Sequence, residues 1–600
     1  MSRLPLIART VPRLGLRNVA RVALYKLRLK LGWRPRPLPY DCPGGAVFDM
    51  VPAREANTGV ASPAALSLFG WHPVSLAAPP DWHADPFGRA PRMDPDQDWV
   101  QALAAVGDGD VKPYWELSRF YWLPQFALAA RNGDSAAAAR IEHWLQDWIA
   151  RNPPFRGINW ACGQEAAIRL MNLTLSALIL DCWRNPSPAM KWLVETHARR
   201  ICPTLSYALG QDNNHGTAEA CALFIAGSWG QGWAMPGAAR IARIGRKWVN
   251  NRALRMIQPD GSPCQYSTTY HRANLEGFCM AGLWSAATGT TGLYAAAAAR
   301  VAQGARWLHA ITDPDHGDAP NLGSNDSSHL FSVPHTPYRD FRPTVALAAA
   351  LFAGERPWPG YADARLDVLG LQPRGATWPP AASRSSDQGG FHILRQGCAT
   401  VLMHYPRFCF RPCQADLLHV DLWIGGDNLL RDAGTFSYNM QGAEWFSGTS
   451  AHNTVTFDGR DQMPRLGRFL FGDWLRAEDV VSVQTGADGV CAAAGYTDRQ
   501  GARHHRHVLL NQEALICTDT ISGSFTNACL RWRLVPREWT LVGQQIRAGG
   551  TVISLNSDSG PLDLTLTKAP ESRYYQHQED IPVLEIGIDR PCTIVTKVEF

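Results

Sequence analysis

The chain has 600 residues, of which 46% are hydrophobic and 18% are charged. This composition excludes a disordered chain, and the length exceeds what one hydrophobic core organises, so two or three globular domains are expected. The longest apolar runs, such as Ala220–Ile225, are far shorter than the roughly 20 residues of a membrane-spanning helix.

The fourteen cysteines are scattered along the chain, and only Cys409 and Cys413 lie close enough in sequence to suggest a local pair. The CxxC spacing of a zinc module and the cysteine density of a disulfide scaffold are both missing from the sequence. Most of these thiols are therefore expected to be small buried hydrophobic groups.

Residues 1–40 form a basic arm with ten Lys or Arg and no Asp or Glu, whereas the whole chain has a net charge of only +5. Arg13, Arg17, Arg21 and Arg28 recur at helical spacing. This pattern is typical of a helix that contacts an anionic membrane or an acidic partner and, more commonly, of an arm packed along its own domain. The arm lacks the apolar stretch of a cleavable secretory signal. No aromatic-and-basic constellation elsewhere indicates a nucleic-acid partner.

From about Asp98 to Gly354 the chain is patterned as helices. Ala and Leu recur at intervals of three and four residues, and short links with Gly, Pro or Asn separate the periodic segments. These segments are Tyr114–Asn132, Asp134–Ala150, Gly163–Leu180, Gly216–Trp229, Ala238–Ile257 and Leu275–Thr288. They predict an all-α domain of paired antiparallel helices, to which we assign residues 41–354.

The composition changes after this region. Residues 355–390 are rich in Pro, Gly and Ser and are predicted to be a linker. Residues 391–600 consist of short alternating runs between turn residues, which is typical of an antiparallel β-sandwich. The runs are Phe391–Leu394, Ala399–His404, His419–Ile424, Asn453–Phe457, His507–Thr518, Ala528–Leu534 and Leu562–Leu566. Helices followed by strands predict two separate domains, one α and one β.

The first polar motif, from Gln211 to Gly216, precedes a helical segment. Its Asn213 is a natural helix N-cap, which is a purely structural role. Two amides and an imidazole at a helix N-terminus also make a good anion site, because the free N–H groups and the helix dipole favour a carboxylate there. Asn214 and His215 are therefore candidates for binding a carboxylate.

A second motif, Tyr270-His271-Arg272, begins the next helical segment. Taken alone, such a run usually belongs to a surface or to packing. A phenol beside a cation, however, favours the phenolate that a general base needs. Tyr270 is therefore a candidate for proton transfer.

A third motif is the polar loop 320–326, which contains Asn325 and Asp326. Its content of Asn, Gly and Ser is too high for a core segment. The loop is either a substrate-facing segment or an ordinary loop of Asx-turns.

The fourth motif lies in the predicted β domain. Alternation along the strand that starts at His419 places His419 and Asp421 on one face, and Asp432 and His452 follow downstream. Two histidines and an aspartate on neighbouring strands would suit a Zn²⁺ ion. Ordinary buried polar residues are the alternative, because the sequence alone does not bring the three together.

In this order, and on a helical domain followed by a β domain, these motifs resemble the heparinase II/III family of polysaccharide lyases, closest to the branch found with exopolysaccharide genes. The resemblance covers roughly Tyr114 to Thr456. The motifs that carry it are Trp115-Glu116-Leu117-Ser118-Arg119, Asn159-Trp160 with Glu165 and Arg169, Asn213-Asn214-His215, Tyr270-His271-Arg272, His419-Val420-Asp421, Asp432-Ala433-Gly434 and Ala451-His452-Asn453-Thr454.

The resemblance implies an incomplete (α/α) toroid followed by an antiparallel β-sandwich, and cleavage of an acidic, uronate-containing polysaccharide by β-elimination. Asn214 and His215 match the residues that neutralise the uronate carboxylate, and Tyr270 matches the tyrosine that transfers protons. His271 and Arg272 complete the expected catalytic set. The expected substrate-binding residues are Trp115, Glu116, Arg119, Trp160, Glu165, Arg169, Asn325 and Asp326.

His419, Asp432 and His452 match a metal site that is structural in relatives, so one structural zinc ion is expected here, and the resemblance implies no organic cofactor. Relatives usually work in the cell envelope, whereas this N-terminus has no recognisable cleavable signal. The envelope is therefore the favoured compartment, with the cytoplasm as the alternative.

The sequence departs from the family at one position. Relatives carry a catalytic histidine two residues before the His-x-Asp motif, where this chain has Leu417. Either Tyr270 makes both proton transfers, His271 substitutes for the missing group, or activity is altered or lost. The last case describes a non-catalytic protein that binds or assembles polysaccharide.

A glycoside hydrolase is a further alternative, because helical toroids host that chemistry too. Glycoside hydrolysis needs two facing carboxylates. Glu116, Asp212, Glu219 and Asp326 are candidates, but their spacing contains no signal of a pair.

Overall fold

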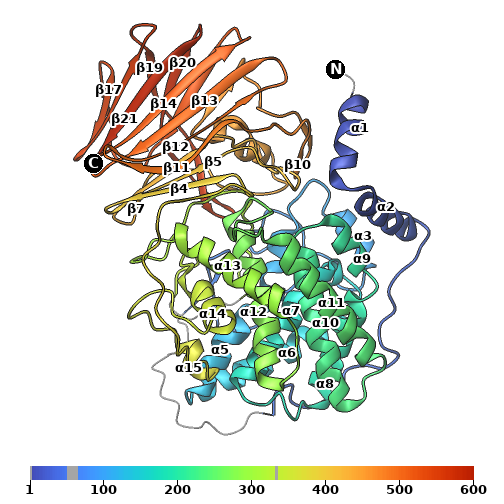
Figure 1. Cartoon of the computed structure of the whole chain (residues 1–600). Helices are drawn as coiled ribbons and strands as arrows, with labels where there is room; N and C mark the ends of the chain where they lie inside the picture. The colour runs from blue at the N-terminus through green and yellow to red at the C-terminus, as the bar shows by residue number, and fades with distance from the viewer. Residues whose placement is uncertain (1–2, 50–64, 331–335) are drawn as a thin grey trace.

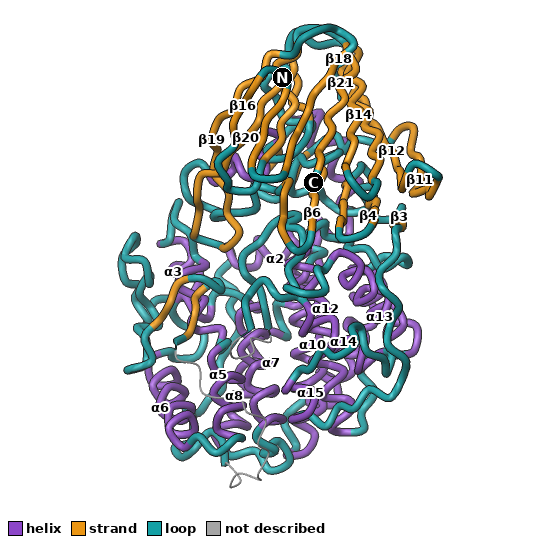
Figure 2. Tube along the Cα trace, turned by 90° about the vertical axis from the view of Figure 1, so that its left-hand side faces the viewer, coloured by secondary structure: helices purple, strands orange, loops and turns teal. Residues whose placement is uncertain are grey.

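The computed structural model describes residues 3–49, 65–330 and 336–600 (Figure 1). A helical domain comes first and an antiparallel β domain follows, so the predicted fold class is confirmed. Figure 2 shows most of the strands gathered at one end of the molecule and most of the helices at the other. Within the described ranges, no helix is long and apolar enough to cross a membrane.

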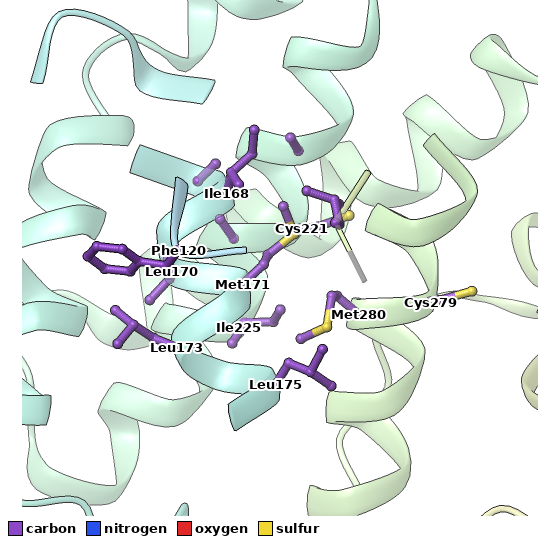
Figure 3. Packing of buried hydrophobic residues seen from close by; sticks show 14 of the residues in the cluster. Phe120, Ile168, Leu170, Met171, Leu173, Leu175, Cys221, Ile225, Cys279 and Met280 are labelled. Atoms are coloured by element: carbon purple, nitrogen blue, oxygen red, sulfur yellow. The ribbon is translucent and has the colours of Figure 1, made fainter. Parts of the chain in front are cut away.

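The helices of the first domain pack side by side around an apolar interior. They are α3 (Trp99–Ala105), α4 (Lys112–Glu116), α5 (Trp122–Arg131), α6 (Ser135–Arg151), α7 (Gly163–Ile179), α8 (Pro188–Ile201), α9 (Leu205–Gln211), α10 (Asn214–Gly230), α11 (Ala238–Met256), α12 (Thr268–Thr288), α13 (Ala295–Ile311), α14 (Arg342–Phe352) and α15 (Ala364–Val368). Helices α7, α10 and α12 are buried along nearly their whole length. Figure 3 shows Met171 and Leu175 of α7 near Ile225 of α10 and Met280 of α12.

Two glycines allow α10 and α11 to approach closely. A Cβ at Gly227 of α10 would lie 2.2 Å from the backbone nitrogen of Ala242, and a Cβ at Gly245 of α11 would lie 2.2 Å from that of Phe224. A side chain at either position would push the two backbones apart. These glycines therefore fix where α10, with the Asn213–His215 motif at its start, lies in the domain.

The β domain contains three main antiparallel sheets. Their strand orders are β11-β12-β13-β14-β21-β18-β17-β16, β19-β20-β15-β8 and β3-β4-β5-β6-β7. The strands are β3 (Arg384–Ser386), β4 (Phe391–Gln396), β5 (Ala399–His404), β6 (Val420–Ile424), β7 (Asp427–Leu430), β8 (Val455–Phe457), β11 (Glu478–Gly486), β12 (Gly489–Thr497), β13 (Ala502–Leu510), β14 (Ala514–Gly523), β15 (Ala528–Arg533), β16 (Thr540–Val542), β17 (Gln545–Ala548), β18 (Thr551–Ser557), β19 (Asp563–Tyr574), β20 (His577–Ile588) and β21 (Cys592–Glu599). Along β13 every second residue is buried, so one face of the large sheet covers a second hydrophobic core.

Two short hairpins complete the strands. One pairs β1 (Leu66–Leu68) with β2 (His72–Val74) before the helical domain, and the other pairs β9 (Arg465–Gly467) with β10 (Leu470–Phe471) within the β domain.

The predicted linker, residues 355–390, contains regular structure. Helix α15 and strand β3 lie within it, and both Trp358 and Trp378 are buried in the helical core. The indole of Trp378 donates a 2.5 Å hydrogen bond to the carboxylate of Glu355. The many Pro, Gly and Ser residues of segment 355–390 therefore mark turns of a packed segment. The domain limits at 354 and 391 stay predictions.

The basic arm forms α1 (Arg3–Leu14) and α2 (Leu16–Lys30) and contacts both domains. Tyr25 of α2 stacks on Tyr207 of α9 with ring centroids 4.1 Å apart. Arg13 of α1 donates to the carbonyl oxygen of Trp474 in the β domain at 3.1 Å. The arm is thus packed along its own protein, one of the two predicted roles, while one face of α2 remains exposed.

Candidate active site

A cavity of about 590 Å³ lies where the arm, the helical domain and loops of the β domain meet. Several of the predicted motifs, although far apart in the sequence, line this one cavity. Its lining residues include Lys112, Trp115, Asn213, Asn214, His215, Gln265, Tyr270, Arg411, Tyr438 and Arg468.

The start of α10 presents a donor group to the cavity. Asn213 is the N-cap, since its side-chain oxygen accepts from the backbone N–H of His215 at 3.2 Å. The Gln265 carboxamide accepts from the backbone N–H of Asn214 at 3.0 Å and donates to the Asn214 Oδ1 atom at 3.2 Å. Because this pair occupies Oδ1, the Nδ2 amide hydrogens of Asn214 are left to donate to a ligand.

His215 follows Asn214 in the first turn of α10 and also lines the cavity. Burial lowers the pKa of His215 to about 3, and the Lys112 ammonium acts in the same direction. The imidazole is therefore neutral at physiological pH and can donate one N–H. Together with the N-terminal end of the helix dipole, Asn214 and His215 form a site suited to an anion.

Tyr270 lies in the first turn of α12, where Ser267 caps the helix by accepting from the Tyr270 backbone N–H at 3.0 Å. Its hydroxyl lies 2.5 Å from the hydroxyl of Tyr438, which belongs to a loop of the β domain. Burial raises the pKa of Tyr270 well above the usual value. Without a bound substrate the cavity therefore holds two hydrogen-bonded, protonated phenols.

Arg411 is the cation beside these phenols. It lies close enough to Tyr270 for their charges to interact, and it lines the same cavity. No carboxylate of the described residues lies within ion-pair distance of Arg411. Lys26 and Arg468 also line the cavity. The cavity wall thus carries positive charge that a negatively charged ligand can balance.

The neighbouring residues of the Tyr270 motif point elsewhere. His271 Nε2 hydrogen-bonds the carbonyl oxygen of Gly304 at 2.9 Å. Arg272 donates to the carbonyl oxygen of Tyr338 at 2.5 Å and packs on two aromatic rings. Both side chains are almost completely buried and neither lines the cavity. The arrangement therefore gives no support to the predicted catalytic roles of His271 and Arg272.

Five of the predicted substrate-binding residues form or adjoin a buried charge network. Arg119 pairs with Glu165 at 2.7 Å and with Glu116 at 2.9 Å, and Asp326 pairs with Lys112 at 2.6 Å. Lys112 also lies over the ring of Trp115. Of these groups only Lys112 and Trp115 line the cavity. Asp326 is placed to hold Lys112 in position from below the cavity surface.

Asn325, from the same polar loop as Asp326, accepts from the Tyr338 hydroxyl at 2.9 Å and links to Thr435 of the β domain. Trp160 and Arg169 lie in the core of the helical domain, where the Arg169 guanidinium packs on the Trp160 ring. These three residues are buried away from the cavity lining, so their predicted contact with substrate stays without structural support.

Leu417 lies in the core of the β domain and is fully buried. Asp416 turns the other way and pairs with His404 at 3.2 Å. Neither side chain reaches the cavity lining. Tyr438 is instead the group from the β domain that meets Tyr270.

The predicted metal ligands do converge. One ligand atom from each of His419, Asp432 and His452 lies within 4.8 Å of the other two, and all three residues are buried. His452 Nδ1 lies 2.8 Å from Asp432, and the Nε2 atoms of both histidines have no hydrogen-bond partner. One contact opposes a metal at His419, because its Nδ1 accepts from the Asn453 backbone N–H at 3.0 Å, which leaves the proton of a neutral ring on Nε2.

Sequence comparison matches residues 379–581 to the heparinase II/III-like C-terminal domain. The matched residues cover most of the β domain. The resemblance inferred from the motifs is thereby confirmed. No curated protein matches it in sequence.

Solved structures extend the likeness to the helical domain. Heparinase III has a TM-score of 0.61 at 15% identity, and the alignment covers 92% of this chain and 87% of that one. A mutant of the heparan sulfate lyase HepC from Pedobacter heparinus has a TM-score of 0.54 at 18% identity, with 97% and 88% covered. Chondroitin AC lyase from Streptomyces coelicolor, in complex with chondroitin sulphate, has a TM-score of 0.51 at 14% identity, with 84% and 76% covered. At these identities the comparisons establish the shared fold.

Among the cavity residues to which the sequence analysis assigned no role are Lys112, Gln265, Arg411, Tyr438 and Arg468. Gln265 lies only five residues before Tyr270, so its place beside that motif was a usable signal. Tyr438 and Arg468 lie in loops of the β domain without a motif around them. Nothing in their local sequence distinguishes them from surface residues.

Proposed function

We propose that this protein is a lyase that cleaves a uronate-containing, acidic polysaccharide by β-elimination. The observation that carries the proposal is the meeting of a carboxylate site, formed by Asn214 and His215, with the Tyr270–Tyr438 pair in one cationic cavity. Proteins of the same fold are named as heparan sulfate and chondroitin lyases, which agrees with an acidic polysaccharide as substrate.

The residue types suit the chemistry of the first step. The C5 proton of a uronate is too weakly acidic to leave until the adjacent carboxylate is neutralised. Asn214 and His215 would donate hydrogen bonds to that carboxylate, and Arg411 would supply a full positive charge. Such preorganised donors usually contribute the largest share of rate acceleration, because they stabilise charge that develops in the transition state.

Two proton transfers complete the reaction. A base removes the C5 proton, the C4–O4 bond breaks as the C4–C5 double bond forms, and an acid protonates the departing O4 oxygen. The Tyr270–Tyr438 pair offers two hydroxyls within 2.5 Å of each other, so one can lose a proton while the other stabilises the phenolate by a hydrogen bond. This pair replaces the histidine that relatives carry at the position of Leu417.

The hydrolase alternative lacks a suitable pair of carboxylates in the cavity. Asp110 and Glu219 are the acidic residues among those that line the cavity. Asp110 Oδ2 already accepts from Ser437 and Tyr575, at 2.5 and 2.6 Å. Burial raises the pKa of Glu219 to about 8, so this group is largely neutral. The two acids are therefore poorly suited to act as a facing pair.

The nature of the products tests the proposal directly. A β-elimination leaves an unsaturated uronate that absorbs ultraviolet light, whereas a hydrolase leaves saturated reducing ends and a binding protein leaves the polymer intact. We expect absorbance to rise with at least one polymer in a panel of glucuronate, iduronate, mannuronate and galacturonate polymers. Depolymerisation without absorbance would contradict the lyase proposal.

We further propose that His419, Asp432 and His452 hold one structural zinc ion. Imidazole nitrogen and carboxylate oxygen are common zinc ligands. The Nε2 atoms of His419 and His452 are buried, have no hydrogen-bond partner and would be available as ligand atoms. Binding would require the Asn453 amide to give up its contact with His419. The site lies in the β domain, away from the cavity lining, so the ion would stabilise that domain and take no part in proton transfer.

Elemental analysis of the purified protein should find about one zinc per chain. His452→Ala should lose the metal and lower Tm. His504→Ala is the matched control, since His504 also pairs with a buried aspartate, Asp519, at 2.6 Å. It should lower Tm but retain the metal. Metal-free protein with an unchanged Tm would contradict the zinc site.

The exposed face of α2 supports membrane contact by the arm. Leu16, Leu24, Leu27 and Leu31 are 71%, 49%, 52% and 76% exposed. With Ala20 they recur at intervals of three and four residues, so they lie on one face of the helix. The opposite face packs on α9. An exposed apolar stripe of this length is unusual for a helix that contacts only water.

Basic residues border this stripe on both sides. At 100° per residue, Arg17 and Arg28 follow one edge and Lys26 and Lys30 the other. All four are exposed, and the whole arm lacks an acidic residue. This is the pattern of an interfacial helix that binds anionic lipid. We propose that α2 docks the protein on an anionic membrane surface.

Sedimentation with lipid vesicles tests this proposal. The protein should bind vesicles that contain phosphatidylglycerol more tightly than pure phosphatidylcholine vesicles, and high salt should weaken the binding. Replacing both Leu24 and Leu27 with Gln should weaken binding by about tenfold or more, because each leucine transfers apolar surface into the bilayer. Leu254→Gln, at a leucine of similar exposure in α11, should leave it unchanged. Equal binding by all three proteins would rule out docking through α2.

A further inference from the structure

Two thiols face each other across the boundary between the helical and β domains. The Sγ atoms of Cys264 and Cys409 lie 3.4 Å apart. Cys264 belongs to the segment between α11 and α12, and Cys409 belongs to the loop between β5 and β6. A disulfide bond is about 2.05 Å long. The two sulfurs, now 3.4 Å apart, would therefore need to move about 1.4 Å closer to form one.

The two segments are already held together beside this pair. The hydroxyl of Tyr266, two residues after Cys264, accepts from the Cys409 backbone N–H at 2.8 Å and donates to the carbonyl oxygen of Arg407 at 3.2 Å. Closing the gap between the sulfurs therefore requires a local adjustment and no rearrangement of the two domains.

The two thiols differ in accessibility. Cys409 is exposed at an open surface hollow that Arg407 and Trp474 also line, whereas Cys264 is buried. Gln258 Nε2 donates to Cys409 Sγ at 2.6 Å. The hydrogen bond from Cys264 lowers the pKa of Cys409 to about 6, helped by that from Gln258. Cys409 is thus the reactive thiolate, and Cys264 is the thiol placed to resolve it.

We propose that Cys264 and Cys409 are a redox modification site, at which a reversible disulfide links the helical domain to the β domain. The Cys409 thiolate attacks one sulfur of a low-molecular-weight disulfide and expels one thiolate. Cys264 then loses its proton to solvent and attacks the Cys409 sulfur of the mixed disulfide, which expels the second thiolate. The two protein thiols lose two electrons, and the external disulfide is reduced to two thiols.

The bond would tie together two walls of the cavity. Gln265, which orients the Asn214 amide, directly follows Cys264. Phe410 and Arg411, which line the cavity, directly follow Cys409. Oxidation would therefore fix the loop that carries Arg411 against the segment that carries Gln265. This inference stands on the sulfur geometry and does not depend on the lyase reaction.

Peptide mass spectrometry of the full-length protein tests the site. The protein is equilibrated in glutathione buffers of rising oxidised fraction, free thiols are alkylated, and the digest is analysed without reduction. We expect a cross-linked peptide that joins Cys264 to Cys409 and disappears on reduction. In Cys264→Ser, the mixed disulfide of Cys409 with glutathione should accumulate instead. Oxidation should raise Tm of the wild-type protein and leave that of Cys264→Ser unchanged.

Cys398 provides the internal control, because it is exposed in the turn between β4 and β5. Its modification by glutathione reports that the buffer is oxidising enough. Glutathione on Cys409 of the wild-type protein without a link to Cys264 would overturn the proposal. So would two unreacted thiols, at Cys264 and Cys409, in a buffer that modifies Cys398.

Discussion

Replacing Tyr270 with phenylalanine should lower kcat by about 10²- to 10⁴-fold, which is the usual contribution of a general acid or base. The change removes only the hydroxyl that meets Tyr438 at 2.5 Å and leaves the ring in place at the start of α12. Folding and KM should therefore stay close to those of the wild-type protein. Initial rates of ultraviolet absorbance with a cleaved polymer measure the effect.

Two further variants test whether Tyr438 shares the proton transfers and whether the loss is specific to Tyr270. Tyr438→Phe should cause a comparable loss if the two phenols share the proton transfers, and a small loss if Tyr270 makes both. Tyr207→Phe removes a phenol that lines the same cavity but stacks on Tyr25, so it should keep most of the activity. A Tyr270→Phe protein that retains more than half of the wild-type rate would refute the assignment.

Replacing Asn214 with alanine should lower kcat by about 10²- to 10³-fold, equivalent to roughly 2.7–4 kcal/mol for one lost donor. The negative charge on the uronate carboxylate grows toward its oxygens as the C5 proton leaves. A donor that acts mainly on this developing charge affects kcat more than it affects KM. Steady-state kinetics separate kcat from KM, provided that the rates are divided by the concentration of folded, active protein.

Asn213→Ala is the matched control, one residue away. Asn213 caps α10 through the His215 backbone N–H, so its loss should cost about 1 kcal/mol of stability and spare the turnover of each folded molecule. Substrate chemistry gives an independent check. Esterified uronate lacks the charge that Asn214 and His215 are proposed to meet and should be cut at a different rate, whereas a neutral glucan should not be cut. Equal cleavage of the unmodified uronate polymer, its ester and the neutral glucan would disprove the carboxylate site.

Hydrophobic periodicity was sufficient to predict the order of the two domains. The predicted helical segments recur as α5, α6, α7, α10, α11 and α12, and the runs Phe391–Leu394 and Ala399–His404 fall within β4 and β5. These features depend on residues three, four or two positions apart, which the sequence displays directly. The same is true of the N-cap at Asn213, which needs only its own helix start.

The sequence predicted individual residues of the candidate site but not which of them lie together. Asn214, His215 and Tyr270 were identified from their local patterns and do line one cavity. His271 and Arg272 share a motif with Tyr270, but adjacent residues of a helix point in different directions, and both turn into the core. Sequence adjacency therefore overstated the catalytic set.

The sequence by itself determined the fold class, the helix start at Asn213 and the basic arm, because each depends on short-range spacing and composition. Only the tertiary structure decided which groups meet. Tyr438 joins Tyr270 from 168 residues away, and Arg411 and Cys409 reach the helical domain through a loop of the β domain. Such contacts depend on how two separately folded cores pack against each other. That packing follows from the sum of many weak interactions between distant residues, which no local pattern records.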